Sequence, residues 1–154
     1  MMLRRIQLPD ITVIGREGCT DEGPDMVSRL WDEANAHFDE IAPLARRNLQ
    51  GKLVGIWGAM SDMSRSFAPW EDDFSRGLYL AGAACKPDAE PPEGWTKWVL
   101  PASEYVYVPN DTVDSFAGGL ALMAEEGLTM CGAAYDYTDP VTGSMYIYYP
   151  IRRL

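Results

Sequence analysis

Two segments of this sequence carry the apolar spacing of amphipathic helices, and each is followed by two strand-like runs. Apolar side chains recur every three or four positions in residues 24–42, and the same spacing returns in residues 112–126. Pro24 suits a first helical turn, and Gly127 suits the residue just past a helix end. This repeated order constrains the fold strongly, because one helix with three strands has too small a core to stand alone.

The remaining segments predict β-strands. Tyrosine and valine alternate in residues 105–108, and tyrosines again share one face in residues 145–148. The Asp-Pro-Val-Thr-Gly run at 139–143 has turn chemistry and predicts a hairpin between the last two strands. The predicted strands cover residues 11–14, 53–57, 78–84, 95–100, 105–108, 128–134 and 144–151.

The element order strand, helix, strand, strand therefore occurs twice, although the two halves share almost no sequence identity. We predict a single α+β domain over residues 1–154, built from two pseudo-symmetric βαββ units at about 1–86 and 95–154. A proline-rich connector at 87–94 joins them. In this arrangement the units form antiparallel sheets, both helices cover one side, and a ligand cleft lies between the halves.

The chain is acidic, with 13 Lys and Arg against 23 Asp and Glu and a net charge of -10. Nucleic-acid binding depends on clustered basic side chains, so we expect no direct nucleic-acid binding. The sequence has neither a signal-peptide pattern nor the run of roughly 20 apolar residues that crosses a bilayer, which predicts a cytoplasmic protein without membrane contact. Three widely spaced cysteines and one histidine are too few for a zinc site, so we expect free thiols, no metal and no cofactor.

Several short stretches share their order and spacing with a known domain. They are Leu30-Trp31 followed by Ile41 and Pro43, Gly55-Ile56-Trp57-Gly58, Tyr79-Leu80-Ala81-Gly82, Pro92-Glu93-Gly94, Leu100-Pro101-Ala102-Ser103-Glu104-Tyr105 and Ile147-Tyr148-Tyr149-Pro150-Ile151. Together they resemble the GyrI-like small-molecule-binding domain, the effector-binding domain of AraC-type regulators, over about residues 8–151. The resemblance implies a duplicated βαββ fold with a cleft for small, often aromatic or cationic molecules. Members of that family serve as multidrug-sensing parts of transcription regulators, as stand-alone proteins and, in some branches, as hydrolases that open strained rings.

Two departures from the family pattern bear on function. The family often has a glutamate on the penultimate strand, where it neutralises a cationic ligand, whereas residues 133–138 here read Ala-Ala-Tyr-Asp-Tyr-Thr. Asp136 is the nearest acidic residue, which leaves strong selectivity for cations open. The sequence also contains no helix-turn-helix segment, so we expect the domain to sense or sequester a ligand without a DNA-binding domain of its own.

Aromatic side chains supply the candidate site, because large rings can wall a pocket, stack on flat ligands and attract cations. Asp136 is the candidate charge, since an acid buried among tyrosines needs a cation, a basic side chain or a proton. For the strand tyrosines the alternative is an exposed sheet face, where strand propensity alone favours Tyr. The predicted ligand-binding residues are Trp31, Trp57, Tyr79, Trp95, Tyr105, Tyr107, Asp136, Tyr137 and Tyr148.

The sequence thus predicts a domain that binds a small hydrophobic, aromatic or cationic molecule. Two alternatives stay open. A hydrolase acting on a reactive natural product would use Asp136 or Glu104 with a tyrosine to activate water, although the sequence assigns no catalytic residue. A module that inhibits a protein partner would instead have a filled cleft and an exposed apolar patch elsewhere.

Overall fold

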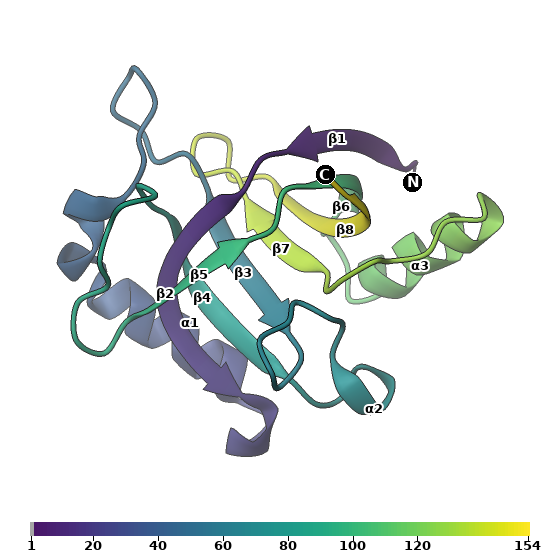
Figure 1. The fold of residues 1–154 in the computed structure, drawn as a ribbon, viewed down its shortest axis with the longest axis horizontal. Helices are drawn as coiled ribbons and strands as arrows, with labels where there is room; N and C mark the ends of the chain where they lie inside the picture. The colour runs from purple at the N-terminus through teal and green to yellow at the C-terminus, as the bar shows by residue number, and fades with distance from the viewer. Residues whose placement is uncertain (1) are drawn as a thin grey trace.

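One eight-stranded antiparallel sheet organises residues 2–154, the part of the chain that the computed structural model describes (Figure 1). The order of strands across the sheet is β1-β6-β8-β7-β3-β4-β2-β5, so β7 and β3 join its two halves at the centre. The strands are β1 (Arg4–Leu8), β2 (Ile11–Cys19), β3 (Ile56–Ser61), β4 (Leu78–Ala84), β5 (Thr96–Leu100), β6 (Ser103–Pro109), β7 (Tyr135–Thr138) and β8 (Met145–Arg153).

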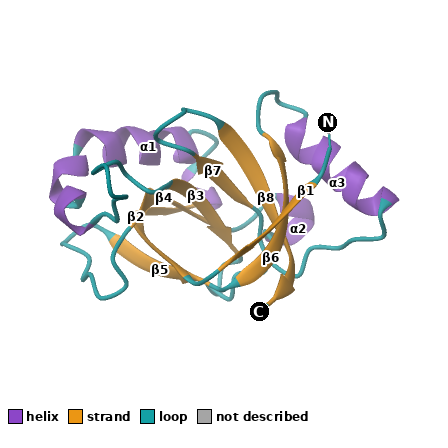
Figure 2. Ribbon diagram, turned by 90° about the horizontal axis from the view of Figure 1, so that it is seen from above, coloured by secondary structure: helices purple, strands orange, loops and turns teal. Residues whose placement is uncertain are grey.

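Helices α1 (Met26–Ala36) and α3 (Ser115–Glu125) pack on different halves of this sheet, α1 on β2 and β4 and α3 on β6. A short turn, α2 (Glu71–Phe74), interrupts the long β3–β4 connection. Viewed from above, the sheet is curled, with α1 outside one half and α3 outside the other (Figure 2). Three 3-10 turns complete the structure, at Thr20–Glu22, Phe38–Glu40 and Ala42–Leu44.

Both faces of the sheet are buried, because successive side chains of a strand point to opposite sides. The face toward the helices holds one cluster of apolar residues under α1, including Tyr79 and Ala81, and a second under α3, including Val108 and Ile147. The opposite face holds a third cluster, which draws residues such as Tyr105 from both halves of the sheet. That cluster lies inside the curl, since only there do the two halves face each other.

The structure corrects several predicted boundaries. Residues 128–134 are irregular rather than a strand, and β7 begins only at Tyr135, because Leu128 and Met130 pack against the α3 cluster as loop residues. The sequence prediction missed β1, whose two arginines are exposed and interrupt any apolar alternation. The first helix ends at Ala36 instead of continuing to residue 42, and the apolar stripe is carried on by 3-10 turns.

The predicted hairpin between the last two strands is present. Strands β7 and β8 pair antiparallel, and the backbone N–H of Asp139 donates to the carbonyl of Ser144 across the turn. Gly143 has a φ of 77°, a conformation that glycine adopts at little cost, which explains the glycine at this end of the turn.

The described residues also bear on the expectations for cysteines, metals and membranes. Cys19, Cys85 and Cys131 are free thiols. Within residues 2–154, no three His, Cys, Asp or Glu side chains gather closely enough to hold a metal ion. In the same range, no helix combines the length and apolar character needed to cross a bilayer.

Candidate functional site

Two neighbouring cavities on the helix-bearing face share the polar residues Asp136 and Asn110 among their lining. The first, with a volume of about 360 Å³, lies between the β3–β4 connection and the start of α3, where Trp70 and Phe116 line it. The second, of about 340 Å³, lies beside α1 and is lined by Trp31 among others. We call the two together the Asp136 cleft, because this residue belongs to both.

Asp136 is the one charged side chain among the described residues that line the cleft. Burial raises the pKa of Asp136 to about 6, and a hydrogen bond from the Tyr79 hydroxyl partly opposes that rise. No basic side chain within residues 2–154 forms an ion pair with it. At neutral pH the cleft therefore holds a carboxylate without a positive partner, an arrangement that a bound cation would stabilise.

Hydrogen bonds fix the orientation of this carboxylate. The indole Nε1–H of Trp31 donates to the Tyr79 hydroxyl at 3.0 Å, and that hydroxyl donates to Oδ2 of Asp136 at 3.4 Å. Burial and the nearby charge of Asp136 hold the pKa of Tyr79 far above its usual value, so the phenol stays protonated and remains a donor. Within residues 2–154, one carboxylate oxygen thus accepts a hydrogen bond and the other accepts none.

A missing side chain makes this contact possible. Gly58 on β3 pairs with Asp136 on β7, and Tyr79 comes from the next strand, β4. A Cβ atom at position 58 would lie 2.0 Å from the Tyr79 hydroxyl oxygen. Only glycine leaves room for the tyrosine ring to cross β3 and reach the acid on the far side.

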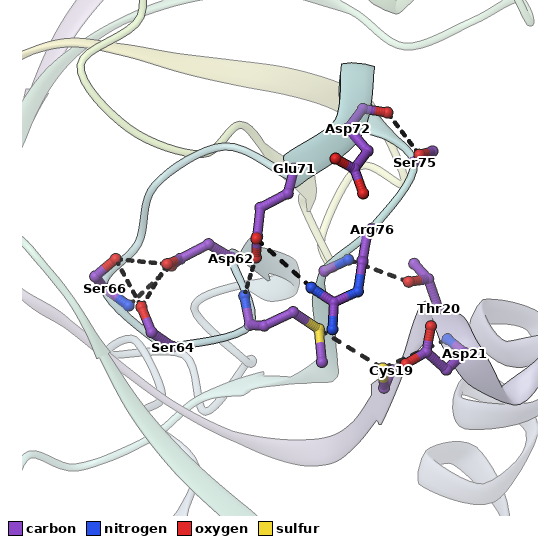
Figure 3. A network of polar contacts seen from close by, with 12 residues as sticks. Cys19, Thr20, Asp21, Asp62, Ser64, Ser66, Glu71, Asp72, Ser75 and Arg76 are labelled. Carbon is purple, nitrogen blue, oxygen red and sulfur yellow. Dashed lines mark hydrogen bonds and ion pairs between the residues drawn. The ribbon is translucent and has the colours of Figure 1, made fainter.

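One wall of the cleft is the β3–β4 loop, residues 62–77, which is held together by its own polar contacts (Figure 3). Asp62 accepts hydrogen bonds from the hydroxyls of Ser61, Ser64 and Ser66 and from the backbone N–H of Ser66 at 2.9 Å. Burial alone would raise the pKa of Asp62, but these hydrogen bonds outweigh that effect and hold it well below its ordinary value. The carboxylate therefore acts as a local anchor for the loop.

The second half of the same loop is anchored by Glu71. Its carboxylate accepts a hydrogen bond from the backbone N–H of Met63 at 3.0 Å and pairs with the guanidinium of Arg76 at 3.6 Å (Figure 3). In this loop, Trp70 and Phe74 line the first cavity. The rings of Phe74 and of Phe116 on α3 form a T-shaped pair with their centroids 5.5 Å apart. The loop thus connects the sheet with α3 over one end of the cleft.

The structure brings four of the nine predicted ligand-binding residues to this cleft. Trp31, Tyr79, Asp136 and Tyr137 line the second cavity. The predicted strand residues could not all line one cleft, because adjacent residues of a strand point to opposite faces of the sheet. Tyr137 reaches the cleft although it follows Asp136 directly, since it lies near the end of β7 and borders cavities on both faces.

Four others lie on the inner face of the sheet. Trp57, Tyr105 and Tyr148 are buried in the cluster inside the curl, with Tyr107 packed against it. Tyr107 and Tyr148 stack at a centroid distance of 5.0 Å and border another cavity, of about 430 Å³, together with Arg4.

Trp95 lies apart from both groups. Its ring packs below the guanidinium of Arg16 at 4.5 Å, and its Nε1–H donates to Glu40 at 2.8 Å. These contacts fasten the β4–β5 connection to the chain that follows α1. Glu104, the alternative acid for a hydrolase, faces Arg152 at 3.4 Å instead of either cavity of the cleft.

Several lining residues were not predicted, and for one of them the signal was available. Val106 and Val108 of β6 face α3, so the two-residue period places Asn110 on the same face as Asp136. Phe116 fits the apolar stripe of the helix predicted over residues 112–126, a pattern that indicates a core residue and gives no sign of a ligand-binding role. Trp70 and Phe74 depend on the conformation of the β3–β4 loop, which no periodicity predicts.

The curled antiparallel sheet with α1 and α3 on its outer side is the GyrI-like fold, as its likeness to solved structures shows. No family model matches the sequence, and no curated protein matches it either. The chain is similar to SAV2435 in a structure with bound tetraphenylphosphonium, with a TM-score of 0.63, 15% identity and coverage of 99% of this chain and 94% of that one.

Two further solved structures share the fold. EcmrR, in its complex with DNA, gives a TM-score of 0.67 at 12% identity over 99% of this chain, which spans 58% of the EcmrR chain. A hydrolase from Listeria innocua gives 0.51 at 14% identity, covering 97% of this chain and 90% of that chain. At these identities the likeness establishes the fold alone, and it confirms the predicted α+β class with an antiparallel sheet.

Proposed function

We propose that the Asp136 cleft binds a small aromatic cation, which the domain senses or sequesters. The observation that carries the proposal is an ionisable acid at the junction of two largely apolar cavities, without a basic partner in residues 2–154. The tetraphenylphosphonium bound to SAV2435 is an aromatic cation, which supports the same ligand class on this fold. The open cavities favour a small ligand over the filled cleft expected of a module that binds a protein partner.

In this proposal the acid and the aromatic residues have different roles in binding the cation. Asp136 neutralises the ligand charge, and the Tyr79 hydroxyl holds its carboxylate in place. The rings of Trp31 and Tyr137 on one side and Trp70 on the other supply stacking area and cation–π attraction. Apolar burial provides most of the affinity, and the acid selects positive charge.

The position of the cleft supports a duplicated unit. Strand orders β2-β4-β3 and β6-β8-β7 correspond, each unit carries its helix between its first and second strands, and the units join where β3 meets β7. We propose that the two βαββ halves are related by a pseudo-twofold axis near this seam. Asp136 lies beside it, so the ligand would sit between the halves.

Tetraphenylphosphonium is the appropriate first probe, because its charge does not titrate. We expect saturable quenching of tryptophan fluorescence, since Trp31 and Trp70 line the cleft, together with a rise in the melting temperature. With a pKa of about 6, roughly 9% of Asp136 is ionised at pH 5 and roughly 91% at pH 7. The affinity should therefore rise about tenfold between these pH values.

Two controls make this experiment specific. Triphenylphosphine oxide has similar rings and no net charge, so it should bind more weakly than the cation and without the pH dependence. Asp136→Asn keeps an oxygen that can accept the Tyr79 hydrogen bond but carries no charge, so it should lose the preference for the cation. Equal binding of the two probes by the wild-type protein, or no saturable binding of either, would reject the proposal.

A second candidate function, hydrolysis, rests on the same acid. A carboxyl group with a pKa of about 6 can accept a proton from water near neutral pH, and Tyr79 keeps it oriented. The fold also occurs in a hydrolase from Listeria innocua. Styrene oxide, a strained electrophile, is a suitable probe: saturable formation of the diol that is lost in Asp136→Asn would favour an enzyme, and no turnover above the buffer rate would exclude this probe class.

A further inference from the structure

We propose that the Asp136 cleft selects cations that carry N–H donors, such as aromatic ammonium or amidinium compounds, through joint recognition by Asp136 and Asn110. The inference rests on the proposed function, because it assumes that the cleft takes a cation. It adds a second polar residue and divides aromatic cations into two chemical classes. Onium compounds without an N–H, such as phosphonium and quaternary ammonium, form the disfavoured class.

The sheet register places the two side chains at a distance that suits a ligand between them. Val108, Ile147 and Asp136 form one row across β6, β8 and β7. Asn110 lies two residues further along than Val108, where its backbone N–H donates to the carbonyl of Met145 at 2.9 Å. Strand spacing and rise place the two Cα atoms roughly 12 Å apart, so the side chains do not meet and leave room for one small ligand group.

Both residues face the same space. Asp136 and Asn110 are the two polar residues that line both cavities of the cleft, while most of the other lining side chains are aliphatic or aromatic. Asn110 is only partly exposed, although it stands just past the end of a strand. Asn110 therefore borders the space that the two cavities share.

The hydrogen-bond inventory of this pair points to a donor on the ligand. Oδ2 of Asp136 accepts the Tyr79 hydroxyl at 3.4 Å, and no group within residues 2–154 donates to Oδ1. The carboxamide of Asn110 has no hydrogen-bond partner in the same range, since its contact with Met145 is through the backbone. An ionised carboxylate only accepts, whereas a carboxamide has an oxygen that accepts and an NH2 group that donates. Oδ1 of Asp136 and Oδ1 of Asn110 are thus two acceptors that a ligand donor could use.

Nothing else in the cleft satisfies these oxygens. The donors nearest to the acid are already used, because Trp31 donates to Tyr79 and Tyr79 donates to Asp136. A phosphonium or quaternary ammonium ion would balance the charge but would donate no hydrogen bond to either oxygen. An ammonium or amidinium group supplies two or more N–H donors together with the charge, so it can bond to both residues at once.

The test compares two cations with the same rings and the same charge, one with hydrogens on the ammonium nitrogen and one with methyl groups there. The probes are 4-biphenylmethylamine, which is protonated at pH 7, and its N,N,N-trimethyl derivative. Titration calorimetry at pH 7 should give a roughly tenfold tighter dissociation constant for the amine, the ratio expected for one well-formed hydrogen bond to a charged group. Asn110→Ala should weaken the amine by about tenfold and change the trimethyl compound by less than about twofold.

A matched variant tests whether the effect on binding depends on where the asparagine lies. Asn48 lies in the turn before β3, is exposed and lines neither cavity, so Asn48→Ala should leave both dissociation constants unchanged. If Asn110→Ala proves unstable, the side-chain amide resonances of Asn110 in the wild-type protein give an independent readout. They should shift with the amine and stay in place with the trimethyl compound.

The possible outcomes distinguish this inference from the function on which it rests. Equal affinities for the two probes, or an Asn110→Ala effect of the same size on both, overturn the role of the N–H donors while leaving cation binding intact. Binding of tetraphenylphosphonium without binding of either biphenyl compound also overturns the inference. If no cation binds, tetraphenylphosphonium included, the proposed function fails first.

Discussion

Replacing Asp136 by Asn tests the claim that the cleft holds a carboxylate at a cost in stability. The pKa of this acid rises from 3.8 to about 6 in the folded protein. Each unit of pKa corresponds to about 1.4 kcal/mol, so the ionised form is disfavoured by up to about 3 kcal/mol relative to an unfolded chain. Asn keeps an acceptor for the Tyr79 hydroxyl, which donates at 3.4 Å, and removes only the charge.

The sign of the pH dependence follows from which state binds the proton. Below about pH 4 the carboxyl is protonated in both the folded and the unfolded chain, so it contributes nothing. Between about pH 4 and pH 6 only the folded state keeps the proton, and the free energy of unfolding falls as the pH rises. Above about pH 6 the whole destabilisation is present, so Asp136→Asn should exceed the wild type by up to about 3 kcal/mol at pH 8 and equal it at pH 4.

Urea unfolding of both proteins at pH 4, 5, 6, 7 and 8, followed by circular dichroism, measures this difference directly. Asp88→Asn is a matched control, because Asp88 is exposed on the connector after β4 and its replacement should change stability by less than about 0.5 kcal/mol at each pH. A stability difference for Asp136→Asn that is the same at pH 4 and pH 8 would refute the reasoning. So would a variant that is less stable than the wild type at pH 8.

Three further substitutions test the packing around the cleft and the sheet. Gly58→Ala places a Cβ atom 2.0 Å from the Tyr79 hydroxyl oxygen, so it should destabilise the fold by about 1–3 kcal/mol and weaken cation binding, as measured by urea unfolding and titration. Gly119→Ala places a Cβ atom 2.3 Å from the hydroxyl oxygen of the fully buried Tyr149. Although alanine is the better helix former by about 1 kcal/mol, thermal unfolding should show a lower melting temperature because of this clash. A higher melting temperature would contradict the packing. Asp62→Ala removes the carboxylate that anchors the β3–β4 loop. We expect the free energy of unfolding to fall by about 1–2 kcal/mol and the affinity for tetraphenylphosphonium to weaken several-fold. If neither value changes, the loop keeps its shape without this anchor.

Much of the fold was predictable, because local spacing sets local structure. Helix α3 and strands β4, β6 and β8 lie close to their predicted ranges, since each has a clear helical or alternating pattern. The failures have local causes as well. Strand β1 lacks apolar alternation, and the apolar residues of 128–134 pack against the α3 cluster without forming a strand.

The candidate site was predictable only in part. Asp136 is the candidate acid from sequence because it is the acid nearest to the position of the family glutamate, and in the structure it lines both cavities of the cleft. The strand period alone indicates that Asp136 and its neighbour Tyr135 face opposite ways, and in the structure Tyr135 belongs to the inner cluster. The same period extends along β6 to Asn110, so this residue was within reach of sequence reasoning.

The sequence by itself determined which residues form strands and helices and which side chains share a face, because these properties depend on neighbours three or four positions away. Only the tertiary structure decided which faces meet. Asp136 is desolvated because β7 pairs with β3, about eighty residues earlier in the chain, and because Tyr79 crosses Gly58 to reach it. Its pKa, its missing counter-charge and the cleft around it all follow from that long-range pairing, which local sequence patterns do not encode.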